Sequence, residues 1–193
     1  IPLGITVEDF IYSDEWCGGI REGHKLKAVV AGGSSVPILS AEMILNTVDG
    51  EKRLMTYESL SDGGFATGTM LGSGGFIVMD ETTCIVHNTL TFARFYHHES
   101  CGQCSPCREG TGWMDKVIYR IEHGKGRKED IDLLVDVAKK IEGNTICPLG
   151  DAAAWPVAAA IRHFRDEFEW HIEHPELAIQ PGAVYMRPGA SWA

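Results

Sequence analysis

The stretch Cys101-Gly-Gln-Cys104-Ser-Pro-Cys107 places three thiols at a spacing of three residues, and Cys147-Pro148 follows forty residues after the last of them. Three cysteines at this spacing can present three thiolates from one compact loop. Thiolates are the usual ligands of iron–sulfur clusters, and a cubic cluster of four irons needs four of them. Structural zinc sites usually combine two well-separated ligand pairs instead. Three closely spaced cysteines with a distant fourth cysteine therefore favour a [4Fe–4S] cluster, with zinc or disulfides as the alternatives.

The composition is that of a folded, acidic chain. The 193 residues are 44% hydrophobic, enough for one large domain or two small ones, and the formal net charge is −10. This charge argues against binding nucleic acid or anionic lipid by simple electrostatics. No apolar run approaches the roughly 18 residues of a membrane-spanning helix, and no N-terminal signal pattern is visible. Six cysteines in such a chain indicate metal chemistry in a reducing compartment, so we expect a soluble intracellular chain that handles electrons.

The first 81 residues predict a small α+β unit. The expected elements are a helix from the N-cap Thr6 to Gly18-Gly19, a strand over residues 25–31, a short helix over residues 56–61 and a strand over residues 76–79. Residues 43–48 are compatible with either a helix or a strand. One helix and two or three strands make a thin core, so the unit looks incomplete.

Two glycine-rich stretches, residues 32–35 and 68–75, invite comparison with phosphate-binding loops. The first lacks the Gly-Lys-Ser/Thr ending, and the second lacks the G-x-G-x-x-G spacing. We therefore predict turns and close backbone contacts at both.

Two cysteines lie outside the cluster motif. Cys17 has no second cysteine nearby and is interpreted as a small buried thiol at the end of the first helix. Cys84 falls in the first turn of a later helix and is interpreted as a packed thiol that could contact the cluster ligands without binding the cluster itself.

From residue 82 the pattern predicts four amphipathic helices joined by short connections that contain glycine. Residues 80–83 offer N-capping side chains for the first helix, which ends at Ser100. The second runs from about Arg108 to Gly124, the third carries apolar residues from Ile131 to Ile141, and the fourth begins near Asp151, with Pro156 expected to bend its first turns.

Four such helices predict a four-helix bundle. The cysteines fall in the connections after the first helix and before the fourth. In an up-and-down bundle these connections lie at the same end, so Cys147 can meet the other three cysteines. Residues 175–193 contain several prolines and are predicted to form an extended tail.

The chain closely resembles the NADH-oxidising flavoprotein subunit of NADH:quinone oxidoreductase (respiratory complex I) in two runs, Glu99-Ser-Cys-Gly-Gln-Cys-Ser-Pro-Cys-Arg-Glu-Gly110 and Ile146-Cys-Pro-Leu-Gly-Asp-Ala-Ala-Ala-Trp-Pro156. The segments Val30–Ser35 and Met70–Gly75 resemble the ubiquitin-like domain of that subunit. The resemblance implies an α+β fold: an incomplete ubiquitin-like (β-grasp) domain over 1–81, an iron–sulfur four-helix bundle over 82–174 and a C-terminal tail over 175–193.

The resemblance also implies the chemistry. It assigns a [4Fe–4S] cluster to the ligands Cys101, Cys104, Cys107 and Cys147. In that family the cluster takes electrons one at a time from FMN that NADH has reduced, and passes them to further iron–sulfur clusters. Pro148 and Leu149 follow the fourth ligand, where they either line the flavin side of the cluster or only exclude water from it.

The family's first half carries a Gly-Arg-Gly-Gly-Ala-Gly-Phe-Pro stretch for flavin and NADH that has no counterpart here. The resemblance thus implies the C-terminal half of the subunit, with FMN and NADH bound by the N-terminal half. No catalytic residue for hydride transfer is assigned to this chain.

The partners implied are the other peripheral-arm subunits of complex I, including a [2Fe–2S] thioredoxin-like subunit and a large iron–sulfur subunit, without nucleic acid and without membrane insertion. The implied location is the cytoplasmic side of the bacterial inner membrane, or the matrix side in mitochondria. One alternative is the flavoprotein subunit of a soluble NAD-linked hydrogenase or formate dehydrogenase. Another is a zinc-stapled interaction module without a redox role.

Three charged or titratable residues flank the cysteine loop. Arg108 either stabilises the reduced cluster or forms an ion pair with Glu109. His97 and His98 are expected to be solvated or capping side chains, not ligands.

Overall fold

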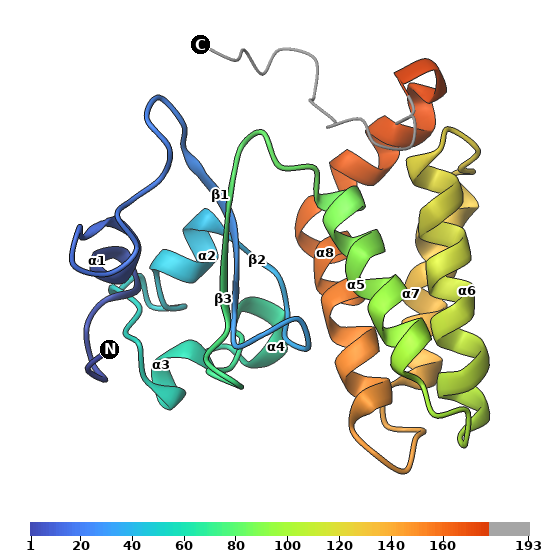
Figure 1. Ribbon diagram of the computed structural model, residues 1–193, viewed down its shortest axis with the longest axis horizontal. Helices are drawn as coiled ribbons and strands as arrows, with labels where there is room; N and C mark the ends of the chain where they lie inside the picture. Colours follow the sequence, from blue (N-terminus) through green and yellow to red (C-terminus); the bar gives the residue numbers. More distant parts are fainter. Residues whose placement is uncertain (178–193) are drawn as a thin grey trace. The chain divides into compact units, whose positions relative to one another are not determined.

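The computed structural model describes residues 1–177, which fall into two compact units, one from Ile1 to Thr83 and one that begins at Cys84 (Figure 1). Of the predicted tail, only the short 3-10 helix η1 (Pro175–Leu177) belongs to the described residues. Within residues 1–177, no helix combines the length and the apolar character that crossing a membrane requires.

The first unit is built on a three-stranded antiparallel sheet. The central strand β1 (Leu26–Ala31) pairs with β2 (Leu39–Ser40) on one side and with β3 (Phe76–Asp80) on the other. The unit also contains four short helices, α1 (Val7–Tyr12), α2 (Ala41–Leu45), α3 (Tyr57–Leu60) and α4 (Gly64–Thr67). Residues from strands and from helices form one core, including Val7, Ile11, Val29, Leu39, Ile44 and Leu60.

Side-chain caps explain where three of these helices begin. The hydroxyl of Thr6 accepts the Asp9 N–H at 2.9 Å, and Thr56 accepts the Ser59 N–H at 3.1 Å. Ser40 caps α2 in the same way. Each bond satisfies one of the N–H groups that a helix leaves free at its start.

The expected strands and helices of this unit are present, with three differences. The first helix ends at Tyr12, well before Gly18-Gly19, because the backbone at Ser13 adopts an extended conformation. The ambiguous residues 43–48 partly belong to α2. Both β2 and α4 escaped prediction, since two residues of strand and four of helix are too short to show a periodic pattern.

The prediction that Cys17 is buried is wrong, because its thiol is exposed. The helix ends at Tyr12, and Cys17 lies in the turns that follow, beyond the reach of the helix's apolar face.

The two glycine-rich stretches lie against each other, backbone to backbone. A Cβ at Gly32, where φ is +126°, would lie 2.2 Å from the Met70 carbonyl oxygen. A Cβ at Gly72 would lie 2.3 Å from the Gly32 oxygen. The N–H of Gly32 donates to the Gly75 carbonyl at 2.8 Å. The prediction of turns and close backbone contacts is therefore confirmed.

A buried arginine forms hydrogen bonds to several connections of this unit. Arg53 is 1% exposed, and its guanidinium donates hydrogen bonds to backbone carbonyls of Met43, Asn46, Ser59, Leu60 and Thr67. One side chain thus fixes the ends of α2, α3 and α4. In these connections, hydrogen bonds from the Arg53 side chain take the place of the backbone hydrogen bonds of a helix or sheet.

Replacing Arg53 with methionine should destabilise this unit by at least about 3 kcal/mol, because several buried carbonyls lose their donor and each such loss costs ~1–3 kcal/mol. Hydrogen exchange of the β1 amides measures this free energy of unfolding. The control is Lys52→Met, which removes the neighbouring exposed cation and its ion pair with Glu8. The control should change stability by less than about 0.5 kcal/mol. Equal effects from the two substitutions would contradict the role of Arg53.

The second unit consists of four long helices, α5 (Ile85–Glu99), α6 (Ser105–Glu122), α7 (Glu129–Ile141) and α8 (Leu149–Glu173), which pack in pairs around a common core. Figure 1 shows that the α5–α6 and α7–α8 connections lie at one end of these helices, the lower end, and that the α6–α7 connection lies at the other. Each helix contributes buried apolar residues, among them Leu90, Met114, Ile118, Leu134, Val157 and Phe168.

Two predicted helix starts shift by a few residues. The cap of α5 is Cys84, whose sulfur accepts the His87 N–H, because the expected cap Asp80 instead binds the Thr82 N–H in the preceding turn. Helix α6 begins at Ser105 and not near Arg108, since Pro106 fits the first turn of a helix without loss of a hydrogen bond.

The expected bend of α8 at Pro156 is also wrong. The non-helical backbone lies at Phe164, where φ is −137° and ψ is 33°. The fixed φ of proline is itself compatible with a helix, so Pro156 removes one N–H donor without breaking the backbone geometry.

Candidate metal centre

The four cysteines of the motif lie at the lower end of the four helices in Figure 1. Cys101 is in the α5–α6 connection, Cys104 is the N-cap of α6, and Cys107 is in the first turn of that helix. Cys147 lies in the α7–α8 connection, two residues before α8. The backbone N–H of Ile146 donates to Cys104 Sγ at 3.4 Å. The two connections therefore meet, as the bundle argument predicted, although the ligand set itself stays a prediction.

Solvent access differs among the four cysteines. Cys107 is 7% exposed and Cys104 is partly buried, whereas Cys101 and Cys147 are exposed. The helix α6 thus shields one side of the candidate site, and the two connections form its open side.

The electrostatics at this end suit thiolates. Helices α6 and α8 both begin here, and a helix start carries partial positive charge and free N–H groups. Partial positive charge of this kind suits the negatively charged sulfur of a metal-bound cysteine. The N–H of Ile146 adds a direct hydrogen bond to sulfur, a contact of the kind that tunes iron–sulfur clusters.

A small network shapes the cysteine loop. Ser100 Oγ lies 3.2 Å from Cys107 Sγ and accepts the Gly102 N–H at 3.4 Å. Arg108 donates from Nη1 to the Gly102 carbonyl at 2.9 Å and from Nε to Glu109 at 2.8 Å. Arg108 therefore forms the predicted ion pair and also clamps the loop backbone.

The sulfur atoms of the motif do not form the compact group that a single zinc ion needs. Tetrahedral zinc bound at about 2.3 Å would hold its sulfur ligands about 3.8 Å apart. Within the described part of the chain, the loop cysteines do not form a group of three whose sulfur atoms all lie within 4.8 Å of one another. In this structure these sulfur atoms are therefore not gathered closely enough for three of them to bind one zinc ion.

The other predicted neighbours take ordinary places. His97 bonds to Asp115 at 3.0 Å, and His98, which is largely exposed, bonds to Glu99. Pro148 is exposed and caps α8, and Leu149 is the half-buried first residue of that helix.

Cys84 does not belong to this site. It precedes α5, whereas the cysteine loop follows that helix, and 15 residues of helix span about 22 Å. The expectation that Cys84 could support the cluster ligands is therefore wrong. The residue instead contacts His171 of α8.

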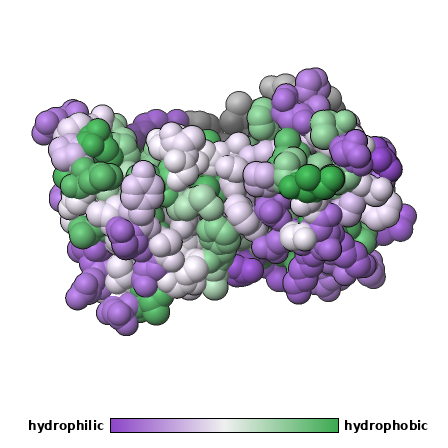
Figure 2. All heavy atoms as spheres, turned by 90° about the horizontal axis from the view of Figure 1, so that it is seen from below, coloured by the Kyte–Doolittle hydropathy of each residue, from purple (hydrophilic) through white to green (hydrophobic). Residues whose placement is uncertain are grey.

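The surface at the cysteine end is mainly hydrophilic, with smaller hydrophobic areas. The right-hand part of Figure 2 shows this end turned towards the viewer. Ile146, beside the fourth cysteine, is 86% exposed. An apolar side chain in that position can pack against another surface.

Sequence reasoning overlooked a group formed by Cys84, Glu122 and His171. The three residues come from three helices, so no local spacing connects them. One signal was available, because Glu122 continues the buried row Met114–Ile118 at intervals of four residues, where an apolar residue is expected.

Residues 87–171, which include all four cysteines of the motif, match the family described as "NADH-ubiquinone oxidoreductase-F iron-sulfur binding region". The match thus covers most of the four-helix unit. Over the residues that they share, the chain is similar to NADH-quinone oxidoreductase subunits designated F. The resemblance carried by the two cysteine runs is confirmed.

Two relatives and one solved structure illustrate the similarity. The F subunit of NADH-quinone oxidoreductase of Rickettsia akari (strain Hartford) is 47% identical over 178 residues, which are 92% of this chain and 39% of that protein. The corresponding protein of Mycobacterium bovis is 45% identical over 180 residues, 93% of this chain and 37% of that protein. The structure of an NAD+-reducing [NiFe]-hydrogenase in the H2-reduced state has a TM-score of 0.70 at 27% identity, covering 89% of this chain and 26% of that one. The chain therefore spans well under half the length of the proteins it matches.

Proposed function

We propose that Cys101, Cys104, Cys107 and Cys147 hold a [4Fe–4S] cluster and that the chain is the electron-relay part of the NADH-oxidising subunit of an NADH:quinone oxidoreductase. The observation that carries the proposal is the hydrogen bond from the Ile146 N–H to Cys104 Sγ, which joins the segment of the fourth cysteine to the loop of the other three. When bound, the cluster carries one electron at a time.

The residues of this chain bind and tune that group. Four thiolates supply the bonds, and the starts of α6 and α8 offset part of their negative charge. The buried side formed by Cys107 keeps water from one face of the site. Solvent access and N–H donation to sulfur are both among the factors that set the reduction potential of such centres.

The proposal extends to the fold and the missing cofactors. We infer that residues 1–81 are a partial ubiquitin-like domain, that residues 82–174 are an iron–sulfur four-helix bundle and that residues 175–193 are a tail. FMN and NADH would be bound by the N-terminal half of the whole subunit. Pro148 and Leu149 would then lie on the side of the cluster that faces the flavin.

The partners would be other peripheral-arm subunits of complex I, including a [2Fe–2S] thioredoxin-like subunit and a large iron–sulfur subunit. The location would be that of a peripheral subunit, on the cytoplasmic face of a bacterial inner membrane or on the mitochondrial matrix side. The exposed apolar Ile146 beside the candidate site suits such an assembly, because an apolar contact excludes water between neighbouring redox centres.

A soluble NAD-linked hydrogenase or formate dehydrogenase is the second candidate, and the hydrogenase structure supports it. That structure is 27% identical to this chain, against 47% for the quinone-linked relative. The difference favours the respiratory enzyme. A zinc-stapled module is disfavoured by the match to an iron–sulfur binding region.

The test is anaerobic purification followed by metal analysis and electron paramagnetic resonance of a reduced sample. Four irons and four sulfides per chain, a brown colour and a [4Fe–4S] signal would support the proposal. Zinc at one ion per chain in a colourless protein would support the interaction module instead.

Arg108 offers a test of electrostatic tuning. Replacing it with glutamine should lower the midpoint potential of the cluster, because the reduced form carries one more negative charge. The shift should be tens of millivolts, since Arg108 is exposed and interactions of exposed charges are worth about 0–1 kcal/mol. The matched variant Glu109→Gln removes the opposite charge of the same ion pair and should raise the potential. Potentiometric titration distinguishes the outcomes, and an unchanged potential in both variants would limit Arg108 to clamping the loop.

A further inference from the structure

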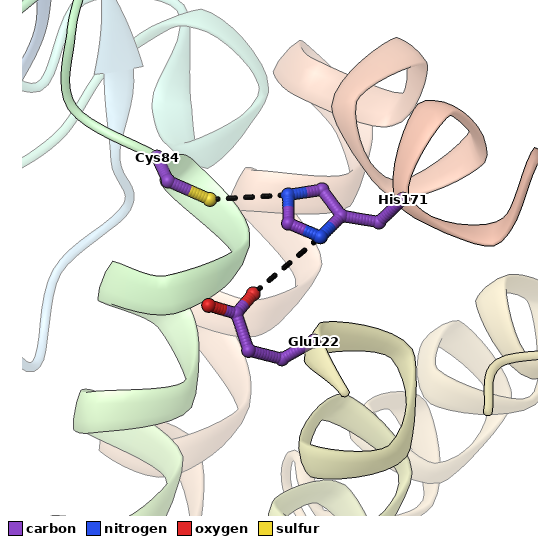
Figure 3. Close-up of side chains that lie close together, drawn as sticks. All are labelled: Cys84, Glu122 and His171. Atoms are coloured by element: carbon purple, nitrogen blue, oxygen red, sulfur yellow. Dashed lines mark hydrogen bonds and ion pairs between the residues drawn. The ribbon is translucent and has the colours of Figure 1, made fainter. Parts of the chain in front are cut away.

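A second group of reactive side chains lies at the opposite end of the four helices from the cysteine loop. Cys84 precedes α5, Glu122 is the last residue of α6, and His171 lies in the last turn of α8 (Figure 3). Their exposed fractions are 8%, 1% and 4%. Polar side chains buried to this extent need a reason, because their desolvation is costly.

The three side chains form a chain of contacts. Cys84 Sγ lies 3.2 Å from His171 Nε2, and His171 Nδ1 lies 3.6 Å from Glu122 Oε2. Figure 3 shows the thiol and the carboxylate beside different nitrogens of the ring. A nucleophile within hydrogen-bond reach of a base, with the base oriented by a third group, is the arrangement of an activated thiol.

The same atoms lie within 4.8 Å of one another and could be taken for a metal site. A metal ion bound to one imidazole nitrogen needs its other ligands on that side of the ring. Here Cys84 contacts one nitrogen and Glu122 the other, so the ring links the two groups and does not share an ion with both. The arrangement favours proton transfer between thiol and imidazole.

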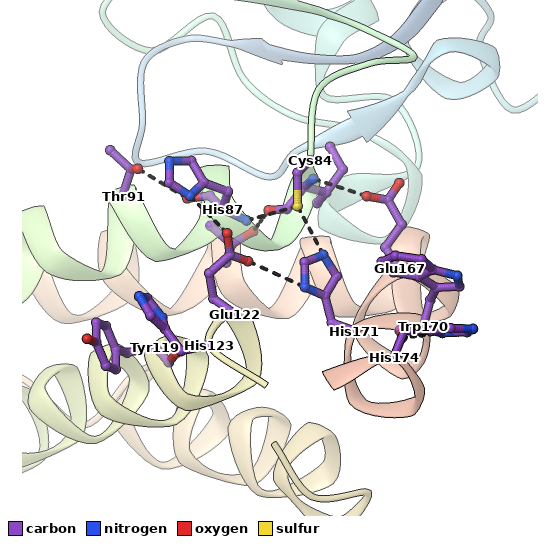
Figure 4. A network of polar contacts seen from close by, with 12 residues as sticks. Cys84, His87, Thr91, Tyr119, Glu122, His123, Glu167, Trp170, His171 and His174 are labelled. Carbon is purple, nitrogen blue, oxygen red and sulfur yellow. Dashed lines mark hydrogen bonds and ion pairs between the residues drawn. The ribbon is translucent and has the colours of Figure 1, made fainter. Parts of the chain in front are cut away.

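The carboxylate of Glu122 is held in a defined orientation. Its Oε1 lies 3.0 Å from His87 Nδ1, and its Oε2, beside His171, has no hydrogen-bond partner among residues 1–177 (Figure 4). Burial raises the pKa of Glu122, and the hydrogen bond with His87 offsets part of that rise. Glu122 therefore lies beside the Nδ1 side of the His171 ring, 3.6 Å away, where it can orient that ring.

Other charged groups also face the site from each helix packed against it. The neighbour Glu167 of α8 already accepts the Ile85 N–H at 3.1 Å. The titratable or charged groups near Glu122 and His171 are His87 and Arg94 of α5, His123 after α6, and Glu167 of α8.

We propose that Cys84 is an activated thiol, held as a thiolate by the imidazolium of His171, which Glu122 positions, and that it reacts with small electrophiles of the peroxide class. The thiolate sulfur attacks one peroxide oxygen, so that an S–O bond forms and the O–O bond breaks. The leaving hydroxide takes the proton of His171 and becomes water. Sulfur loses two electrons, peroxide gains them, and a sulfenic acid remains at Cys84.

Cys17 is the internal control, because its thiol is exposed and desolvation raises its pKa. The test measures alkylation of both residues by iodoacetamide in the intact chain with its cluster, under anaerobic conditions, by peptide mass spectrometry. An ordinary thiol loses about tenfold in rate for each pH unit below its pKa. Between about pH 8 and pH 6 the Cys17 rate should fall about a hundredfold, and the Cys84 rate less than about threefold. At about pH 6 we expect Cys84 to react faster although it is more buried.

Two variants test the roles of the neighbours. At the same acidic pH, His171→Gln should lower the Cys84 rate by at least about tenfold and restore the steep pH dependence, whereas Glu122→Gln should have a smaller effect of the same kind. In a second measurement, a sulfenic-acid reagent added with dilute hydrogen peroxide should label Cys84 before Cys17. Helical circular dichroism and visible absorption show whether each variant is folded with its cluster.

A steep pH dependence of Cys84 in the unmodified chain would overturn the proposal, and that measurement does not depend on whether the variants fold. Labelling of Cys17 before Cys84 by peroxide would overturn it as well. An unchanged profile in a folded His171→Gln variant would exclude the imidazole as the base.

Discussion

Replacing Cys104 with alanine should abolish the [4Fe–4S] signal of the reduced protein. Cys104 is the N-cap of α6, and its sulfur is the atom that the α7–α8 connection approaches through the Ile146 N–H. Without this ligand the cluster keeps three thiolates, and the hydrogen bond between the two connections is lost as well. Iron content and electron paramagnetic resonance after anaerobic purification measure the result.

Cys17→Ala and Cys84→Ala are the matched controls for this experiment. Cys17 belongs to the first unit, and Cys84 lies about 22 Å along α5 from the cysteine loop. Both variants should keep the full iron content. Loss of all iron in either of them would contradict the assignment of Cys101, Cys104, Cys107 and Cys147.

Removal of the cluster should loosen the start of α8 more than any other part of the helices. A metal that links Cys107 to Cys147 closes a loop of forty residues, and by the relation used for disulfides this closure is worth about 4 kcal/mol as an upper figure. Whole domains are stable by only ~5–15 kcal/mol. Four unbound thiolates also repel one another, so the apo form should open at the cysteine end.

Hydrogen exchange on matched holo and apo samples measures this loosening. The Ala152 N–H, which donates to the Pro148 carbonyl at 2.9 Å, should lose protection with the amides that follow it. The Trp155 indole N–H, which donates to Glu142 at 2.7 Å, is independent of the metal and should limit the opening to the first turns. The β1 amides of the first unit are the control. Equal protection of residues 146–161 in both samples would mean that helix packing alone stabilises the cysteine end of the unit.

Long periodic segments were predictable from the sequence, and short ones were not. The four long helices appear because apolar residues such as Met114 and Ile118 recur at helical spacing over many turns. The short strand β2 and the single turn α4 contain too few residues for a pattern. The local pattern predicted a bend at Pro156 and gave no sign of the non-helical backbone at Phe164.

The candidate site was predictable because its residues are close in sequence. Three cysteines within seven residues limit the geometry severely, and the helix order brings Cys147 to the same end. The group at Cys84 was not predictable, since Glu122 and His171 reach it only through the packing of three helices. Arg53 is a similar case, because an arginine directly after a lysine gives no sign that it will be buried.

The four cysteines are unequally buried, so reagents in solution reach some of them before others. Cys101 and Cys147 sit in exposed connections, whereas Cys107 is fixed within a helix and is 7% exposed. If the four cysteines hold the proposed cluster, a chelator or an oxidant would reach Cys101 and Cys147 before Cys107. The bonds to Cys104 and Cys107, at the start of α6, would then be the last to break, and a partly degraded cluster would stay attached to that helix.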